Sequence, residues 1–276
     1  MKPNIGFSLQ GNYTAPMEDV LPLLRDVGFD AVSPVWQQDG SHEAVLRTAQ
    51  ACGLILQSLH GPFRGITGMW EQAAPAILPE LLQSVDACAR YGIPVLVVHV
   101  WGGYHYSFRE ETLCFDHFDV LVEYAQRKGI RIAFENLEGP EYLNILMARY
   151  KDDHTVGFCW DCGHEFCYTP QSDMLAAYGD RLLMTHLNDN FGITRADGQI
   201  QGTDDLHLLP YDGHLNWTCC MDRLKQAKSQ QILNFEFKIR PKGDRCTTDL
   251  YSKMPLTQYF EKAYDRARRV SAGYFE

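Results

Sequence analysis

Long apolar runs are missing from this sequence of 276 residues. No segment approaches the roughly 20 consecutive apolar residues that a helix needs to cross a bilayer. The N-terminal segment, MKPNIGFSLQGNY, also lacks the apolar core of a secretory signal peptide. We therefore expect a cytoplasmic protein that makes no contact with a membrane.

A surplus of positive charge is missing as well. The chain has 25 Lys and Arg residues against 35 Asp and Glu residues, which gives a formal net charge of −10 at pH 7. A protein whose main partner is a DNA or RNA backbone needs a basic face. We therefore expect no nucleic-acid partner.

Paired cysteine motifs are scarce. The nine cysteines are odd in number and scattered over the whole chain, which is typical of a reduced protein rather than of a disulfide framework. Cys159 and Cys162 form a C-x-x-C motif, but no second such pair completes a zinc site. We interpret both as buried free thiols.

Linker-like and low-complexity segments do not interrupt the chain, and no glycine-rich phosphate loop follows its first apolar run. The missing loop disfavours a dinucleotide-binding doubly wound sheet. The length is close to the ~250 residues typical of one α/β barrel. We therefore expect one domain that covers residues 1–276.

One local pattern recurs along the chain. A helical stretch ends in glycine and a short apolar run follows at once, around Gly28, Gly53, Gly92 and Gly129. Glycine caps the helix, and the apolar run is typical of a buried strand, so the repeat indicates βα units around a parallel sheet. The predicted fold class is α/β, a (β/α)₈ TIM barrel, with an open sheet as the alternative. Its eight strands are expected at 5–9, 30–35, 54–59, 95–100, 131–136, 155–160, 182–187 and 232–237.

Polar residues stand at the C-terminal edge of six of these strands, where α/β barrels build their active sites. Side chains alternate between the two faces of a strand, so each candidate predicts which of its neighbours point inward. In the strands of Glu135, Asp161 and Glu236, the large apolar residues all point outward, toward the helices, when the carboxylate points inward. The six residues are His60, His99, Glu135, Asp161, His186 and Glu236.

Three of these six residues are carboxylates that would share one space. At ~4 Å and an effective dielectric of ~20, each pair repels by about 4 kcal/mol. A divalent cation removes that cost, and a neutral histidine completes the ligand set. We therefore predict one divalent metal, Mn²⁺ or Zn²⁺ first and Mg²⁺ or Co²⁺ as alternatives, on Glu135, Asp161, His186 and Glu236.

A second group of residues is expected over the same mouth. Short spacings place Asp161 near His164 and Asp205 near His207. Trp101 shares the parity of His99, and Lys238 shares that of Glu236. We predict that these residues bind substrate or additional metal, together with His60 and His99; loop capping, packing and an ion pair of Lys238 are the structural alternatives.

Five motifs at and after the strand ends stand out in the second half of the chain: FENLEG, WDCGH, THLNDN, DDLHLLPYDGHLNW and NFEFK. They resemble motifs of the xylose-isomerase-like barrel superfamily, which includes sugar isomerases, ketose 3-epimerases, inosose dehydratases and endonuclease IV. The segment from His186 to Trp217 looks most like bacterial sugar phosphate isomerase/epimerase proteins.

The resemblance to ketose 3-epimerases implies a metal-dependent isomerase or epimerase that abstracts a proton beside a metal-polarised carbonyl. It implies one Mn²⁺-like ion on Glu135, Asp161, His186 and Glu236, with Glu135 and Glu236 as the acid/base pair. Those epimerases also carry an Arg shortly after the His ligand. Here Asn190 occupies that position, and Arg195 lies further along the loop.

Endonuclease IV is the main rival within the superfamily. It binds three zinc ions through nine ligands, and by resemblance this chain offers a candidate for each. The acidic net charge disfavours a DNA backbone, so we expect a small-molecule sugar or sugar phosphate as the partner. Keto-sugar or inosose dehydration is the other alternative, and a homo-oligomer stays open. The nine candidates are His60, His99, Glu135, Asp161, His164, His186, Asp205, His207 and Glu236.

Overall fold

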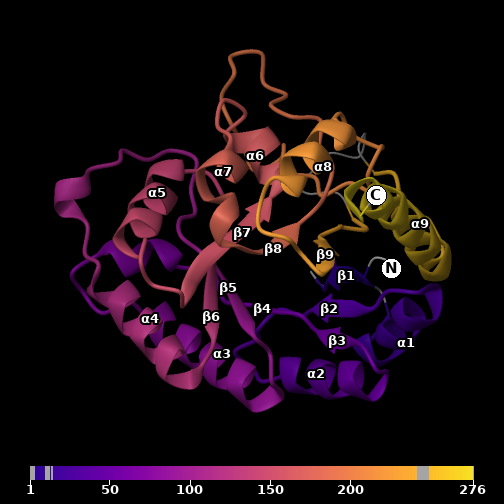
Figure 1. The fold of residues 1–276 in the computed structure, drawn as a ribbon, viewed down its shortest axis with the longest axis horizontal. Coiled ribbons are helices and arrows are strands. Elements are labelled where there is room, and N and C mark those ends of the chain that lie inside the picture. Colours follow the sequence, from indigo (N-terminus) through magenta and orange to yellow (C-terminus); the bar gives the residue numbers. More distant parts are fainter. Residues whose placement is uncertain (1–3, 10–12, 14, 241–248, 276) are drawn as a thin grey trace.

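Parallel strands alternate with helices in this computed structural model, which describes residues 4–9, 13, 15–240 and 249–275. The helices surround the strands, as Figure 1 shows. The strands are β1 (Asn4–Ser8), β2 (Ala31–Ser33), β3 (Ile55–Leu56), β4 (Leu59–His60), β5 (Val95–His99), β6 (Arg131–Glu135), β7 (Val156–Asp161), β8 (Leu182–His186) and β9 (Ile232–Phe235). The α-helices are α1 (Met17–Val27), α2 (His42–Ala51), α3 (Ile77–Tyr91), α4 (Asp116–Lys128), α5 (Pro140–Arg149), α6 (Cys162–Tyr168), α7 (Met174–Tyr178), α8 (Trp217–Lys225) and α9 (Leu256–Phe275), with 3₁₀ turns η1 (Ile66–Trp70), η2 (Glu110–Thr112) and η3 (Gly179–Arg181).

Two sheets form the barrel wall. One has the order β3-β2-β1-β9 and the other the order β4-β5-β6-β7-β8, and every pairing is parallel. Single bridges join them at two seams, Val35 with His60 and Leu187 with Phe235. The strands therefore close into the predicted (β/α)₈ barrel.

The third predicted strand, 54–59, is divided in the structure into β3 and β4. The division falls at Gln57 and Ser58. The Ser58 hydroxyl donates to the hydroxyl of Ser33 at 2.9 Å, and the Gln57 amide donates to the carbonyl of Ile232 at 3.4 Å. Polar side chains thus bond across this part of the barrel where the strand ladder is interrupted.

The inward and outward sides of the strands differ as their alternation predicts. Ala133 and Cys159 belong to a small apolar cluster with Val95, Val97 and Met184. The large residues of the opposite parity, such as Phe134 and Trp160, pack in the main core. The inner cluster fills the barrel below the ends of β5 to β8, and the polar strand-end residues stand above it.

Long segments follow the last strands. The segment 189–216, described throughout, contains no helix and only a single bridge between Asp189 and Leu208. Asp189 is fully buried and accepts hydrogen bonds from the backbone of Asn190, Tyr211 and Leu215 and from the Trp217 indole. One buried carboxylate therefore orders this loop. Of the second long loop expected, 240–255, residues 241–248 lie outside the described part.

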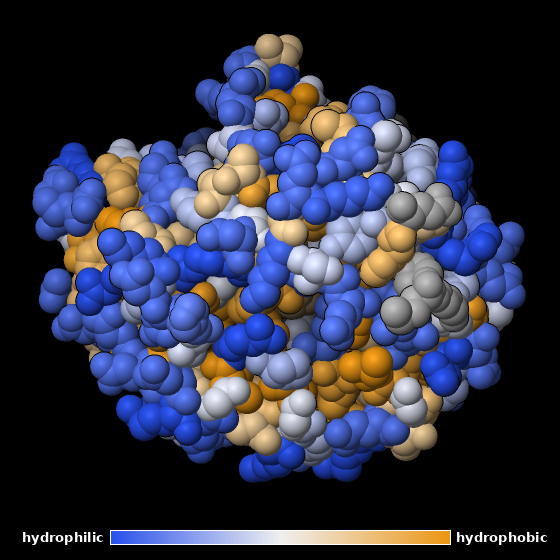
Figure 2. Space-filling model, in the orientation of Figure 1, coloured by the Kyte–Doolittle hydropathy of each residue, from blue (hydrophilic) through white to orange (hydrophobic). Residues whose placement is uncertain are grey.

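The helices, the cysteines and the surface can be compared with what the composition predicts. No helix within the described part of the chain is long and apolar enough to cross a membrane. The eight cysteines among the described residues are free, and Cys159 and Cys162 are buried, as predicted. On the face shown in Figure 2, hydrophobic side chains gather beside β3 and α2 while hydrophilic ones cover most of the upper half.

Candidate active site

The four predicted metal ligands meet at the C-terminal ends of β6 to β9. Glu135, Asp161, His186 and Glu236 each offer a ligand atom, and these atoms lie within 4.8 Å of one another. His186 Nδ1 lies 2.9 Å from Oε1 of Glu135 and 2.6 Å from Oε2 of Glu236. All four residues are at most 3% exposed. Ligand atoms this close together suit one shared cation.

The charges of this group depend strongly on one another. Burial raises the pKa of the Asp161 carboxyl. Burial would also raise the pKa of Glu135, but contact with His186 holds it well below its usual value. Burial opposes protonation of His186, yet Cys159, Glu236 and Glu135 raise its pKa well above the ordinary range. In the metal-free protein a protonated imidazole therefore balances the two glutamates.

Two carboxylate oxygens in this cluster face histidine nitrogens. Oε2 of Glu135 lies 3.4 Å and 3.2 Å from Nε2 of His60 and His99, and Oε2 of Glu236 lies 2.6 Å from Nδ1 of His186, which Glu135 shares. Neither oxygen accepts a well-aligned hydrogen bond from a described residue, so both can bind a cation. Carboxylate oxygens with one imidazole nitrogen suit Mn²⁺, Zn²⁺, Mg²⁺ or Co²⁺. The residues present fit a divalent cation.

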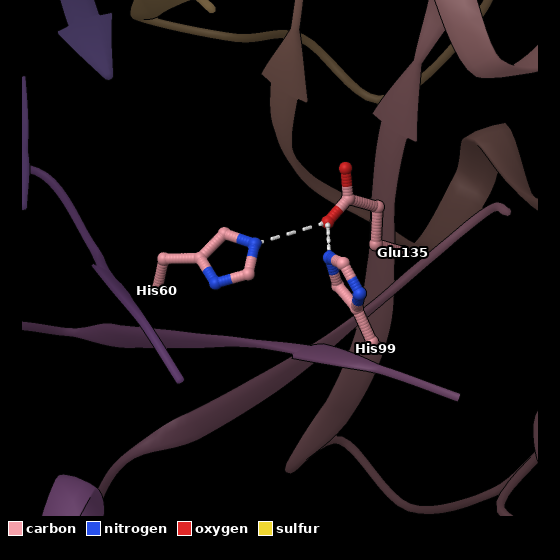
Figure 3. A group of neighbouring side chains, drawn as sticks. All are labelled: His60, His99 and Glu135. Atoms are coloured by element: carbon pink, nitrogen blue, oxygen red, sulfur yellow. Dashed lines mark ion pairs between the residues drawn. The ribbon is translucent and has the colours of Figure 1, made fainter. Parts of the chain in front are cut away.

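His60 and His99 lie together beside Glu135, as Figure 3 shows. Their Nε2 atoms lie 3.4 Å and 3.2 Å from Oε2 of Glu135. His60 Nδ1 is 2.9 Å from the Gly61 carbonyl, so a neutral ring that donates there keeps its lone pair on Nε2, facing Glu135. These three residues form a second possible ligand group that shares Glu135 with the first.

A third ligand group comprises His164, Asp205 and His207. Nδ1 of His164 lies 3.0 Å from the Asn136 carbonyl, and Nδ1 of His207 lies 3.0 Å from the Glu236 carbonyl. Nε2 of each ring then faces Asp205, at 3.5 Å and 2.9 Å. Burial opposes protonation of His164, but Asp161 and Asp205 raise its pKa to about 10.

His207 adopts a backbone conformation that non-glycine residues avoid, with φ of 51°. Its amide donates to Oδ1 of Asn190, and its carbonyl accepts from the amide of Lys238. Bonds on both sides therefore hold His207 in place and offset the backbone strain.

Two asparagines position Asp161. The Asn136 amide donates to the Asp161 carbonyl, while its Oδ1 accepts from the Asp161 amide, both at 2.8 Å. The Asn188 amide donates to both carboxylate oxygens of Asp161 at 3.0 Å, and Asn190 donates to Asn188. Gly163 leaves room for this pair, since an added Cβ would lie 1.9 Å from Asn188 Oδ1. The sequence motifs contain these residues, but their positioning role depends on contacts that spacing does not reveal.

A cavity of about 330 Å³ opens above the clustered ligands. Glu236 lines it, whereas Glu135, Asp161 and His186 are absent from its wall. Trp101 stacks on Tyr142 with ring centroids 3.9 Å apart. Nζ of Lys238 lies 3.8 Å from Oδ2 of Asp205, which is the ion pair expected as the structural alternative to substrate binding. The remaining predicted residues on the wall are His60, His99, Trp101, His164, Asp205, His207 and Lys238.

Sequence reasoning missed three polar residues of the cavity wall. Glu138 is buried and accepts a hydrogen bond from the Gly103 amide at 2.7 Å. Tyr104 and Tyr168 bring their hydroxyls within 3.2 Å of each other. Glu138 lies inside the FENLEG motif that follows β6, so its place past a strand end was an available signal. The tyrosines come from a loop and a helix, and nothing in their spacing marks them.

Most of the chain matches the model of one protein family. The model described as xylose isomerase-like TIM barrel matches residues 21–256, which is most of the chain. The chain belongs to this family. The chain is also similar to the protein y4fM of Sinorhizobium fredii (strain NBRC 101917 / NGR234), which is 29% identical over 266 residues that cover 81% of this chain and 82% of that protein.

Solved structures agree on this xylose isomerase-like fold. The IolI protein with a bound zinc atom superposes with a TM-score of 0.71 at 17% identity, covering 99% of both chains. The 3-keto-D-glucoside 4-epimerase YcjR of E. coli gives 0.71 at 17% identity over 97% of this chain and 100% of that one. D-psicose 3-epimerase with D-tagatose from Clostridium cellulolyticum H10 gives 0.69 at 12% identity over 97% and 99%. At these identities the likeness establishes the fold.

The resemblance to ketose 3-epimerases singles out Asn190 and Arg195. The Asn190 side chain is fully buried and accepts from the amides of Leu206 and His207. The Arg195 side chain is 45% exposed and pairs with Asp197. Asn190 therefore holds the loop, and Arg195 lies on its surface.

Proposed function

We propose that this protein is a metal-dependent isomerase or epimerase that acts on a sugar or sugar phosphate by moving a proton at a carbon next to a carbonyl. The observation that carries the proposal is the buried group Glu135, Asp161, His186 and Glu236 beneath a cavity. Two of its carboxylate oxygens accept no well-aligned hydrogen bond from a described residue, although histidine nitrogens face both. Ligands arranged in this way, next to space for a small molecule, are what such chemistry requires.

Glu236 is assigned the proton transfer at the cavity wall, since it lines the cavity and is only 3% exposed. Glu135 is assigned as the second member of the acid/base pair. It lies on the other side of the ligand group, where it contacts His60 and His99. A divalent cation in the site supplies a Lewis acid that polarises the carbonyl or hydroxyl of the substrate. His60, His99 and Lys238, all on the wall, orient the hydroxyls.

The names of the structural neighbours support the same class. One is a 3-keto-D-glucoside 4-epimerase, one a D-psicose 3-epimerase with D-tagatose bound, and one holds a zinc atom. Since the identities are low, they suggest the chemistry without fixing the substrate. The free thiols of the described residues suit a cytoplasmic location, which we propose along with a single domain and no nucleic-acid partner.

Solvent exchange tests the proposal. In heavy water, the protein loaded with Mn²⁺ or Zn²⁺ should incorporate deuterium at the carbon beside the carbonyl of a ketose, aldose or keto-cyclitol. Glu236→Gln should lower the exchange rate by about 10²- to 10⁴-fold, because the variant cannot take up the proton. Glu123→Gln, at a 69% exposed carboxylate in α4, is the matched control. Equal exchange by Glu236→Gln and the control would rule out the assigned role.

Phosphodiester cleavage is the second candidate, and a specific observation favours it. Among the described residues, three ligand groups that use different histidines meet at the mouth, and Glu135 belongs to two of these three groups. In His60, His164 and His207 the second ring nitrogen faces a backbone carbonyl, a frequent arrangement for metal ligands. Three zinc ions per chain, with cleavage of an abasic DNA duplex and no sugar exchange, would favour this function. One ion per chain with sugar exchange would exclude it.

A further inference from the structure

A second cavity lies next to the one above the metal ligands. It measures about 490 Å³, and its wall includes Trp36, Gln38, Pro62, Phe63, Arg64 and Glu80. Trp36 and Gln38 follow β2, residues 62–64 follow β4, and Glu80 comes from the first turn of α3. The cavity therefore lies over the opposite half of the barrel mouth from the segments after β6 to β8.

Phe63 is the residue shared by both cavities. Its ring stacks on His99 with centroids 5.1 Å apart and meets His60 edge-on at 6.1 Å. It is nevertheless 47% exposed, so much of its ring is open to a ligand. A ligand that leaves the inner cavity on this side passes directly over Phe63.

The outer cavity combines apolar ring surfaces with hydrogen-bonding groups. Phe63, Pro62 and Trp36 supply flat apolar surface. The side chains of Gln38, Arg64 and Glu80 make no hydrogen bond or ion pair with a described residue, so their polar atoms are available to a ligand. A sugar ring has the matching chemistry, with C–H groups on its faces and hydroxyls at its edge. Arg64 and Glu80 have opposite charges, which suits a neutral ring.

We propose that the substrate is a glycoside with two rings. The sugar that reacts occupies the inner cavity, and a second sugar ring, joined to it by a glycosidic bond, binds in the outer cavity against Phe63. This proposal rests on the function proposed above and extends it to the substrate class. Contacts with the second ring position the first over Glu236, so they raise kcat/KM for the whole glycoside.

Matched sugar pairs test the proposal. Deuterium exchange is measured on the metal-loaded protein with a panel of free hexoses and the disaccharides that contain them, such as glucose with cellobiose and maltose, and galactose with lactose. The expected result is a kcat/KM at least tenfold higher for one disaccharide than for its free hexose. Gln38→Ala and Arg64→Ala should each remove about fivefold to tenfold of that advantage and leave exchange of the free hexose unchanged. Arg109→Ala, at an exposed arginine outside both cavities, is the control.

Binding measurements separate this proposal from the proposed function. Titration calorimetry with the same sugars gives affinities whether or not exchange occurs. If no sugar exchanges but a disaccharide binds and Arg64→Ala weakens it, the two-ring site stands and the proposed chemistry is wrong. If free hexoses exchange and bind as well as every disaccharide, the chemistry stands and the two-ring site is wrong. If no sugar either binds or exchanges, both are wrong.

Discussion

Replacing Gly163 with alanine tests how Asp161 is positioned. Gly163 is the second residue of α6, and its neighbours Asn188 and Asn190 fill the space where a side chain would project. An added Cβ would lie 1.9 Å from Oδ1 of Asn188 and 2.4 Å from Nδ2 of Asn190. These distances are far below contact, and Asn188 is the residue that donates to both oxygens of Asp161.

Two opposing effects decide whether Gly163→Ala raises or lowers the free energy of unfolding. In an unhindered helix, Gly→Ala stabilises by about 0.5–1 kcal/mol. Here overpacking costs about 1–3 kcal/mol, and losing buried hydrogen bonds to a charged carboxylate costs about 1.5–3 kcal/mol more. We therefore expect a net loss of roughly 2–5 kcal/mol, or about 4–10 °C in Tm at roughly 2 °C per kcal/mol. Metal affinity should fall about 10- to 100-fold, as it does when a ligand's supporting residue is lost.

Urea unfolding of the metal-free protein and calorimetric titration with Mn²⁺ and Zn²⁺ measure the two effects. Gly273→Ala is the matched control, because Gly273 lies within α9 and its added Cβ would meet nothing closer than Met221 at 4.0 Å. That variant should be slightly more stable than the natural protein and bind metal equally well. A Gly163→Ala protein that behaves like the control would refute the placement of Asn188 and Asn190 against Asp161.

Four further predictions concern the site. His99→Ala should lower turnover by at least tenfold and shift Tm by less than about 3 °C, as measured by exchange kinetics and calorimetry. The reason is that Nε2 of His99 contacts Glu135 and does not pack in the hydrophobic core. Metal affinity should rise with pH through the neutral range, with proton release seen by titration in buffers of different ionisation enthalpy, because the raised pKa of His186 keeps its ring protonated until a cation displaces the proton. His164, whose folded pKa is about 10, should stabilise the metal-free protein below about pH 6.5 and lose that contribution as the pH rises toward 10, which urea unfolding at several pH values detects. Removing metal with a chelator should lower Tm by an amount equivalent to about 2.7 kcal/mol at a free metal concentration 100 times Kd.

Other results would contradict the expectations for His99, for His186 and for the chelator. A His99→Ala protein that unfolds early but turns over normally when folded would make the residue structural. Metal binding without proton release at pH 7 would mean that the His186 ring is already neutral. An unchanged Tm after chelation would mean that the ligand group holds no ion in the folded protein.

Much of the barrel could be predicted because its strands are short apolar runs next to helix-ending glycines. The alternation in β6, β7 and β9 even gave the side on which Glu135, Asp161 and Glu236 lie, since large side chains fit only on the helix-covered face. The break between β3 and β4 could not be predicted. It depends on hydrogen bonds of Gln57 and Ser58 with distant strands, which local composition does not encode.

The residues of the site could likewise be predicted only in part. Residues at strand ends were found because their polarity contradicts their buried setting. Asn188 and Asn190 were not assigned a role, because hydrogen-bonding side chains in a loop carry no such contradiction. For the second cavity, the aromatic residues Trp36 and Phe63 at strand ends were a signal, but Arg64 and Glu80 join them only when the segments after β4 and at the start of α3 meet.

The seam between the two sheets gives the ligand group a further consequence. His186 ends β8 in one sheet, and Glu236 follows β9 in the other, with only the bridge from Leu187 to Phe235 formally joining the sheets there. A cation bound by both side chains would act as a non-covalent cross-link across a seam that a single bridge closes. Substrate chemistry and the closure of the cylinder then depend on the same ion, so metal loss would loosen the wall at the point where the proton is moved.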